Sequence, residues 1–224
     1  DAVLASSVKP CSPGTTTLTS PDAAESFQSP VGLPSTPMLP LPVFAESRPT
    51  TPVSLMSPLP VLLKFDPSGK LVQSFGSGIA VFPHGIHVDR DGNVWLADGN
   101  DNLPRRAPGA PADAPLPPTP AKVVGHQVFK FSPDGKLLLT LGKPGGNQPG
   151  QPADPASFYQ PNDIITYPNG DILVAEGHGN APPATARLIR FDKNGKFLRE
   201  FGKMGTGTEG EFMQPHGLAF DAKG

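Results

Sequence analysis

The sequence predicts an all-β fold built from repeated pairs of hairpins. One hairpin pattern occurs three times and ends each time on Phe-Gly or Leu-Gly. The copies are "VLLKFDPSGKLVQSFG" (61–76), "HQVFKFSPDGKLLLTLG" (126–142) and "ARLIRFDKNGKFLREFG" (186–202). A second hairpin pattern follows each copy, starting on a proline and reaching a turn glycine nine positions later. No helical periodicity runs for a useful length. The repeats therefore indicate strands.

The turns inside these patterns carry clear chemical signals. "PSGK", "PDGK" and "KNGK" each stand between alternating apolar residues. Asp-Gly and Asn-Gly are strong hairpin signals because glycine and asparagine reach the positive φ that tight turns need. The second pattern is "PHGIHVDRDGNVWLADG" (83–99), "PNDIITYPNGDILVAEG" (161–177) and "PHGLAFDAKG" (215–224). Each complete stretch is expected to form a strand, a turn and a second strand.

Two hairpins supply four strands, which is the content of one β-propeller blade. On this basis we assign blade units to residues 61–99, 126–177 and 186–224. The last unit stops on a turn that the other copies continue as "NVWLAD" and "DILVAE". Three blades cannot close a ring, and an open ring leaves unpaired sheet edges. The sequence therefore predicts an incomplete propeller of about three blades over residues 61–224, with more blades in the full-length protein.

The remaining segments have a different composition. Residues 1–60 are rich in Pro, Ser and Thr, and they carry too little apolar surface to order by themselves. We predict that this segment is mostly irregular and disordered. Two Pro/Gly-rich loops, residues 100–125 and 143–157, interrupt the predicted strands. Their length favours either disorder or a lid over one face.

Composition also excludes some classes of function. The formal net charge of −2 gives no basis for a nucleic-acid partner, which requires a dense field of Lys and Arg. No apolar run approaches the roughly 20 residues of a membrane-spanning helix. Cys11 is the only cysteine, so the chain can form neither an internal disulfide nor a Cys-x-x-Cys metal site. No signal peptide is recognisable at the start of the sequence.

One position in the second hairpin pattern carries a candidate metal site. The innermost strand of each blade lines the central channel, so equivalent positions form a ring around the axis. The position after the proline is His84, then Asn162, then His216. Two imidazoles that converge on an axis suit zinc, and a third from the next alternate blade would complete an open site. That third histidine would lie beyond residue 224. The alternative is that both histidines are turn residues bonded to the backbone.

Together these motifs resemble a known family. The units "FPHGIHVDRDGNVWLADG", "HQVFKFSPDGKLLLTLGKPG", "FYQPNDIITYPNGDILVAEG" and "MQPHGLAFD" look like NHL repeats, which form six-bladed propellers. Their order resembles more narrowly that of the peptidyl-α-hydroxyglycine α-amidating lyases. The resemblance covers residues 61–224. It implies cleavage of a carbinolamide into an amide and glyoxylate, acting on a small-molecule or peptide-like substrate. It also implies a secreted or periplasmic protein that is a monomer.

The resemblance further implies a set of site residues. In that family three histidines from alternate blades bind zinc, and His84 and His216 match the first two. The backbone carbonyl of Ile86 matches a ligand of a structural calcium ion. His178, in "EGHGN", stands where the family has a catalytic tyrosine, and a histidine can act as a base near neutral pH. Arg48 is the candidate for a substrate-binding arginine. Tyr159 and Gly179 replace the cysteine pair of the animal enzymes.

Two other functions fit the same pattern less well. A non-catalytic NHL propeller that binds a protein or another ligand would use the histidines only as turn residues. A calcium-dependent propeller hydrolase, such as a lactonase, would need carboxylate and Asn side chains at the axis. The ring of His84, Asn162 and His216 disfavours the hydrolase. A metal-dependent lyase is the leading hypothesis.

Overall fold

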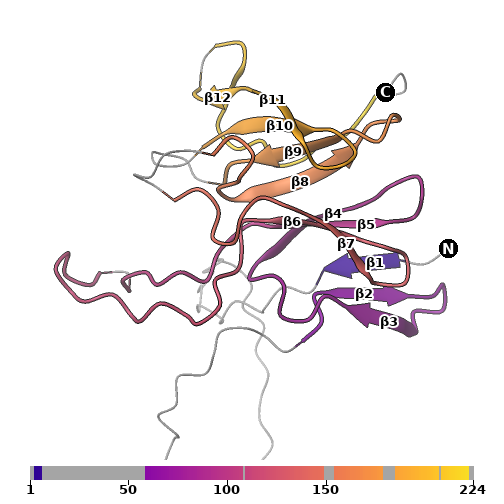
Figure 1. Ribbon diagram of the computed structural model, residues 1–224, viewed down its shortest axis with the longest axis horizontal. Helices are drawn as coiled ribbons and strands as arrows, with labels where there is room; N and C mark the ends of the chain where they lie inside the picture. Colours follow the sequence, from indigo (N-terminus) through magenta and orange to yellow (C-terminus); the bar gives the residue numbers. More distant parts are fainter. Residues whose placement is uncertain are drawn as a thin grey trace, which may run out of the picture. The chain divides into compact units, whose positions relative to one another are not determined.

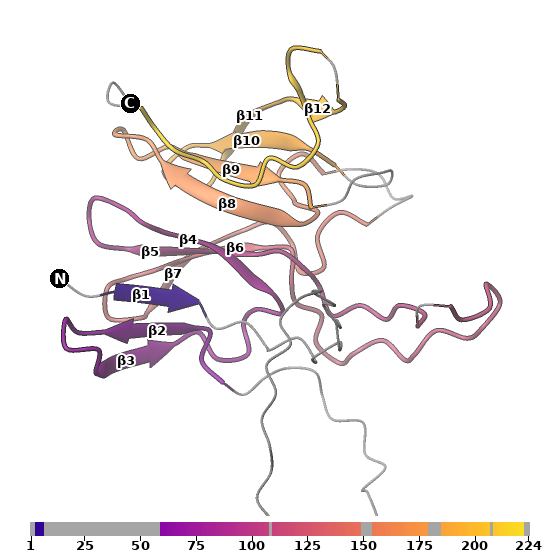
Figure 2. The same cartoon turned by 180° about the vertical axis from the view of Figure 1, so that it is seen from behind.

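The structure is a computed structural model, drawn in Figures 1 and 2. It describes residues 59–107, 109–148, 154–178, 185–206 and 208–221, and the backbone of residues 3–6. The chain divides into two units, Asp1–Val8 with Ser54–Gly224, and Lys9–Val53. The second unit, which includes Arg48 and most of the segment predicted to be disordered, lies outside the described residues. The described ranges contain no helix that is long and apolar enough to cross a membrane.

The described residues are organised as β-strands, which confirms the all-β prediction. In chain order the strands are β1 (Val3–Ser6), β2 (Leu62–Phe65), β3 (Leu71–Phe75), β4 (Pro83–Val88), β5 (Val94–Asp98), β6 (Val128–Phe131), β7 (Leu137–Leu141), β8 (Pro161–Thr166), β9 (Ile172–Glu176), β10 (Arg187–Phe191), β11 (Phe197–Phe201), β12 (Lys203–Met204) and β13 (Glu211–Phe212).

The strands form antiparallel sheets of the kind found in propeller blades (Figure 1). One sheet has the order β4-β5-β6-β7 and another has the order β8-β9-β10-β11. Strands β1, β2 and β3 form a three-stranded sheet, in which β1 pairs with β2. The short strands β12 and β13 pair in parallel. Four-stranded antiparallel sheets are what a partial NHL propeller requires, so the predicted fold class is confirmed.

The sheets group the hairpins differently from the predicted blade units. The units 61–99 and 126–177 each join two hairpins that belong to different sheets, because β5 pairs with β6 rather than β3 with β4. The four-stranded sheets instead span residues 83–141 and 161–201. The predicted blade boundaries are therefore wrong by one hairpin: each four-stranded sheet begins at the second hairpin of a predicted unit. A repeat in sequence fixes a period, but only the pairing of strands shows where each period begins.

The hairpin turns form for the reason that the sequence suggested. In the β2–β3 turn, the Asp66 carboxylate accepts hydrogen bonds from the backbone N–H groups of Ser68 and Lys70, at 2.9 and 3.0 Å. Gly69 takes a φ of 83° at the end of that turn. The β10–β11 turn repeats this arrangement with Asp192 and Gly195. In these two hairpins, an acidic side chain that bonds the turn backbone acts together with a left-handed glycine to set the register.

The hydrophobic core lies on both faces of the β4–β7 sheet. Every residue of β5 is buried, and successive side chains of the strand face opposite ways. Trp95 and Ala97 pack in one cluster with Ile164 and Val174 of the β8–β11 sheet. Val94 and Leu96 belong to a second cluster with Leu62 of β2. The outer strands β3, β7 and β11 are mostly exposed. β5 is therefore a strand buried on both faces, as is β9, whose residues are all buried too.

The two Pro/Gly-rich loops are tied together near their bases. The Asp101 carboxylate accepts hydrogen bonds from Arg105, at 2.8 and 2.9 Å, and from Gln148, at 2.9 Å. His126 Nε2 lies 3.0 Å from Asp101 Oδ2. Burial acts to raise the pKa of Asp101, but the bonds from His126 and Arg105 hold that pKa well below its usual range. These contacts anchor the beginning of the first loop to the described part of the second.

Candidate metal centre

His84 is the second residue of β4, and contacts from the end of β5 fix the chain just before it. The backbone N–H groups of Phe82 and Val81, just before β4, donate to the Asp98 carboxylate at 2.7 and 3.0 Å. Gly99 N–H donates to the carbonyl of Phe82 at 2.9 Å. Asp98 is fully buried, and this burial raises its pKa to about 6. The end of β5 therefore holds the chain as it enters β4.

A single hydrogen bond determines which nitrogen of His84 is free. His84 Nδ1 lies 2.9 Å from the backbone carbonyl oxygen of Asn162 on β8. A carbonyl oxygen can only accept, so Nδ1 carries the proton and Nε2 keeps its lone pair. Burial lowers the pKa of His84, and the neighbouring His216 and His178 lower it further, although the bond to Asn162 opposes them. Nε2 is thus available as a neutral ligand, the form that metals bind.

Three imidazoles come together at this end of β4. His84, His178 and His216 each offer a nitrogen, and these nitrogens all lie within 4.8 Å of one another. The ring centroids of His84 and His216 are 4.7 Å apart, and that of His178 lies 5.1 Å from the first and 5.3 Å from the second. His178 and His216 are exposed, and His84 is half-buried. In the described residues this is the cluster of His, Cys, Asp or Glu side chains that could hold a metal ion.

Residue Asn162 links the three histidine segments. Its carbonyl accepts from the His84 ring, while its Nδ2 donates to the Gly177 carbonyl at 2.5 Å and to the Pro215 carbonyl at 3.2 Å. Gly177 and Pro215 directly precede His178 and His216. Asn162 itself is fully buried. It therefore acts in this ring as the link that positions the imidazoles.

The neighbouring Asp163 makes a second connection to the His216 segment. Its Oδ2 accepts a hydrogen bond from Leu218 N–H at 2.8 Å. Phe82 packs against two of the imidazoles, with centroid distances of 5.7 Å to His84 and 6.4 Å to His178. The loop that carries His216 is thus fastened on both sides of that residue, and an aromatic ring borders the site.

The donor set fits zinc. Three neutral imidazole nitrogens are characteristic of catalytic zinc sites, which keep a further position open for substrate. Nitrogen ligands of tetrahedral zinc lie about 3.3 Å apart, given Zn–N distances of about 2.0–2.1 Å. The separations of up to 4.8 Å among the three nitrogens are somewhat wider. Because His178 and His216 are exposed, their side chains have room to close this difference.

Two predicted site residues are not among the clustered histidines. Ile86 is on β4, two residues beyond His84, and is paired in register with Leu96 of β5. Its side chain packs against the second hydrophobic cluster. Calcium binding at its carbonyl remains a prediction. Arg48 lies outside the described residues.

Sequence reasoning missed several residues that build the site. Asp98 and Asp163 hold backbone segments. Asn162 was placed in the ring of equivalent positions, but its role as the link between the histidines was not expected. A signal existed for Asp98, since Asp98 and Glu176 end corresponding strands as "LAD" and "VAE". Both are fully buried, and Glu176 accepts hydrogen bonds from Thr185 and Arg187. Acids at equivalent strand ends thus indicate carboxylates that hold a neighbouring chain segment.

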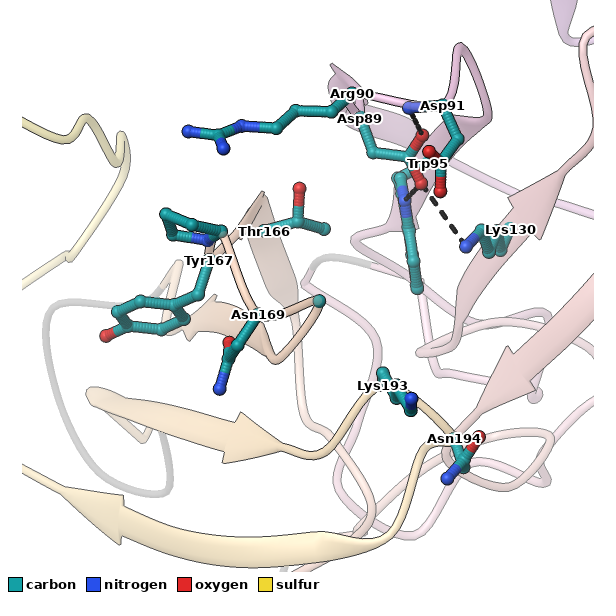
Figure 3. A pocket seen from close by; sticks show the side chains of 12 residues that line it. Asp89, Arg90, Asp91, Trp95, Lys130, Thr166, Tyr167, Asn169, Lys193 and Asn194 are labelled. Atoms are coloured by element: carbon teal, nitrogen blue, oxygen red, sulfur yellow. Dashed lines mark hydrogen bonds and ion pairs between the residues drawn. The ribbon is translucent and has the colours of Figure 1, made fainter.

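A hollow lies at the opposite ends of β4 and β8 from the histidine cluster, where the hairpin turns are (Figure 3). It has a volume of about 380 Å³, and its lining includes Lys193 and Tyr167. The Asp89 carboxylate accepts from the Trp95 indole N–H at 3.1 Å and lies 3.2 Å from Lys130 Nζ. The Tyr167 ring is covered by the Arg190 guanidinium, 4.3 Å from its centroid. Much of this polar lining is thus engaged in contacts of its own.

Comparison with known proteins gives the site its context. No protein-family model matches the chain. Mouse peptidyl-glycine α-amidating monooxygenase is 32% identical over 165 residues, covering 70% of this chain. Peptidyl-α-hydroxyglycine α-amidating lyase 1 of Drosophila melanogaster is 31% identical over 146 residues, covering 63% of it. Over this region the chain is homologous to the amidating lyases. The resemblance that the sequence motifs indicated is confirmed.

The homology also has a clear extent. Human NHL repeat-containing protein 3 is 26% identical over 169 residues, covering 74% of the chain and 41% of that protein. The chain spans 14% of the mouse monooxygenase and 21% of the Drosophila lyase. It therefore corresponds to only a part of its amidating-lyase relatives. The activity of the whole protein is accordingly proposed in the next subsection.

Proposed function

We propose that the protein containing this chain is a zinc-dependent carbon–nitrogen lyase that cleaves peptide-like carbinolamides. The observation that carries the proposal is the convergence of His84, His178 and His216 at one end of β4, in a chain homologous to amidating lyases. In this proposal His84, through Nε2, and His216 are zinc ligands. Calcium at the Ile86 carbonyl and a substrate contact from Arg48 belong to the same proposal.

The reaction needs a base and a polarised oxygen. Bound zinc would supply a Lewis acid that makes the substrate hydroxyl more acidic. His178 is the base that would accept the hydroxyl proton. The C–N bond then breaks, its electron pair passes to the amide nitrogen, and that nitrogen takes up a proton. The hydroxyl-bearing carbon becomes the aldehyde carbon of glyoxylate, so the reaction involves no net oxidation or reduction.

The other residues of the cluster orient these groups. Asn162 keeps the His84 ring turned so that Nε2 faces away from the bonded carbonyl, and it fixes the backbone before His178 and His216. Phe82 covers one side of two imidazoles. Apolar cover near a metal site excludes water and strengthens electrostatic interactions there.

A direct assay tests the proposal. The full-length protein is incubated with N-benzoyl-α-hydroxyglycine, and glyoxylate release and bound zinc are both measured. We expect stoichiometric zinc and glyoxylate formation, with both lost in His84→Ala and in His216→Ala. The matched control is His87→Asn, because His87 contacts Thr166 at 2.9 Å and lies outside the cluster. Zinc without glyoxylate release would favour a non-catalytic propeller, and absence of zinc would refute the site.

A further inference from the structure

His178 lies almost as close to His84 and to His216 as these two zinc-ligand candidates lie to each other. Its centroid lies 5.1 and 5.3 Å from those of His84 and His216, close to the 4.7 Å between those two. The three ring planes are tilted by 47–77° to one another, so no pair is stacked face to face. A residue that acted only as a base on substrate would need no such close approach to both ligands.

The backbone places His178 there by specific contacts. Gly177 N–H donates to the Gln160 carbonyl at 3.0 Å, and the Gly177 carbonyl accepts from Asn162 Nδ2. Gly177 has a φ of 132°, and a Cβ at this residue would lie 2.2 Å from the Thr185 carbonyl oxygen. Only glycine fits such a close backbone approach with this φ. The chain is therefore built to leave β9 in the direction that brings residue 178 to the cluster.

The ring of His178 has no competing polar partner among the described residues. Its contacts there are with the rings of Phe82, His84 and His216. His84, in contrast, uses Nδ1 for the Asn162 carbonyl. The three nitrogens, all within 4.8 Å of one another, therefore include one from His178 that no described polar group occupies.

We propose that His178 is itself a metal ligand in the substrate-free protein, so that this chain alone supplies three imidazoles to the zinc. This inference rests on the proposed function for the identity of the metal and deepens the role of the same site. In the substrate-free protein the His178 imidazole would hold the metal together with His84 and His216. The base role proposed above would require this side chain to be free of the metal when substrate is bound.

The test compares zinc binding by the full-length wild-type protein and its variants in competition with a chromophoric chelator. X-ray absorption counts the imidazole ligands in the same samples. We expect His178→Ala to weaken zinc binding by at least about 100-fold, because even changes to residues that only support ligands cost about 10- to 100-fold. The count of imidazoles should fall by one. His178→Gln, a second variant, should weaken binding in the same direction.

Controls separate a lost ligand from a damaged fold. His178 is exposed, so its replacement is expected to change the stability of the metal-free protein by less than about 0.5 kcal/mol, checked by thermal unfolding in chelator. His87→Asn should bind zinc as the wild type does. Unchanged affinity and an unchanged imidazole count in both His178 variants would overturn the inference.

The outcomes for the ligand and for the function are distinguishable. If wild-type protein releases glyoxylate and His178→Ala still binds zinc normally, His178 is not a ligand and the lyase function stands. If zinc binding depends on His178 but the wild type releases no glyoxylate, the ligand assignment stands and the proposed function fails.

Discussion

Among single residues, Asn162 has the widest effect on the site. It occupies the same position in its hairpin as His84 and His216 do in theirs, but it is fully buried and bonds the segments of all three histidines. The sequence showed the equivalence of these positions. It could not show that the middle one links the other two, because that depends on which carbonyls approach its side chain.

The side-chain amide of Asn162 can be removed while its backbone carbonyl stays. We expect Asn162→Ala to lower the free energy of unfolding by about 1–3 kcal/mol, because two carbonyls lose their donor. Zinc affinity should fall by about tenfold, as for other residues that orient ligands. Thermal unfolding in chelator and competitive zinc titration measure the two effects. Asn169→Ala, in the exposed β8–β9 turn, is the control. Unaltered zinc affinity in Asn162→Ala would show that the histidines are positioned without this amide.

At the scale of elements, the close approach of β4 and β8 positions His84. The two strands are in contact, and a Cβ at Gly85 would lie 2.3 Å from the Asn162 carbonyl oxygen. That is the oxygen to which the His84 ring donates. Glycine after the histidine therefore permits the bond that orients the ring. The glycine is visible in the sequence as part of "PHG". Only the packing of β4 against β8 explains why a glycine is needed at this position.

A pair of glycines in the same motif tests this explanation. Gly85→Ala should push β4 away from β8 and cost about 1–3 kcal/mol of stability, as overpacking does. Zinc affinity should fall with it. Gly217→Ala is the matched control, because Gly217 also follows a Pro-His pair, yet nothing lies within 4 Å of its Cβ position. Thermal unfolding of the two variants measures the loss of stability in each. An equal loss of stability in Gly85→Ala and Gly217→Ala would contradict the explanation.

The hydrogen bonds between the end of β5 and the residues just before β4 depend on an ionisable group, Asp98. Its pKa is raised to about 6, chiefly by burial. The folded chain therefore binds this proton more tightly than the unfolded chain does. The stability that this proton contributes is complete below about pH 4 and is lost as pH rises through 6.

Comparison with Asp98→Asn isolates this contribution. The free energy of unfolding of the wild type, relative to the variant, should fall by about 3 kcal/mol between pH 3 and pH 7, at 1.36 kcal/mol for each unit of pKa difference. It should be constant above pH 7. Denaturant unfolding at a series of pH values gives the curve. A difference that rises with pH would mean that the Asp98 pKa is lowered instead.

At the scale of the whole molecule, the three histidines come from three separate parts of the chain. His84 lies on β4, His178 follows β9, and His216 follows β13. A metal ion bound by all three would cross-link these segments in the folded state alone. Binding to the folded state stabilises it by mass action.

Zinc should therefore raise the melting temperature of the wild-type chain. At a free zinc concentration 100 times the dissociation constant the gain is about 2.7 kcal/mol, which corresponds to roughly 5–10 °C for a domain of this size. Differential scanning calorimetry with zinc and with chelator measures it. His84→Ala should show no zinc-dependent shift. A shift of the same size in that variant would place the metal elsewhere.

The sequence alone determined the all-β class, the hairpins and the homology to amidating lyases, because turn chemistry and alternation are local properties of the chain. It also marked His84, His178 and His216 as separate candidates. The tertiary structure decided the rest. Which hairpins share a sheet depends on pairing across long connections, so the blades shifted by one hairpin. The gathering of three imidazoles around Asn162 depends on contacts between residues far apart in sequence, such as His84 with Asn162, 78 residues apart, and Asn162 with Pro215, 53 residues apart. No local pattern encodes such contacts, since they arise only when the sheets pack.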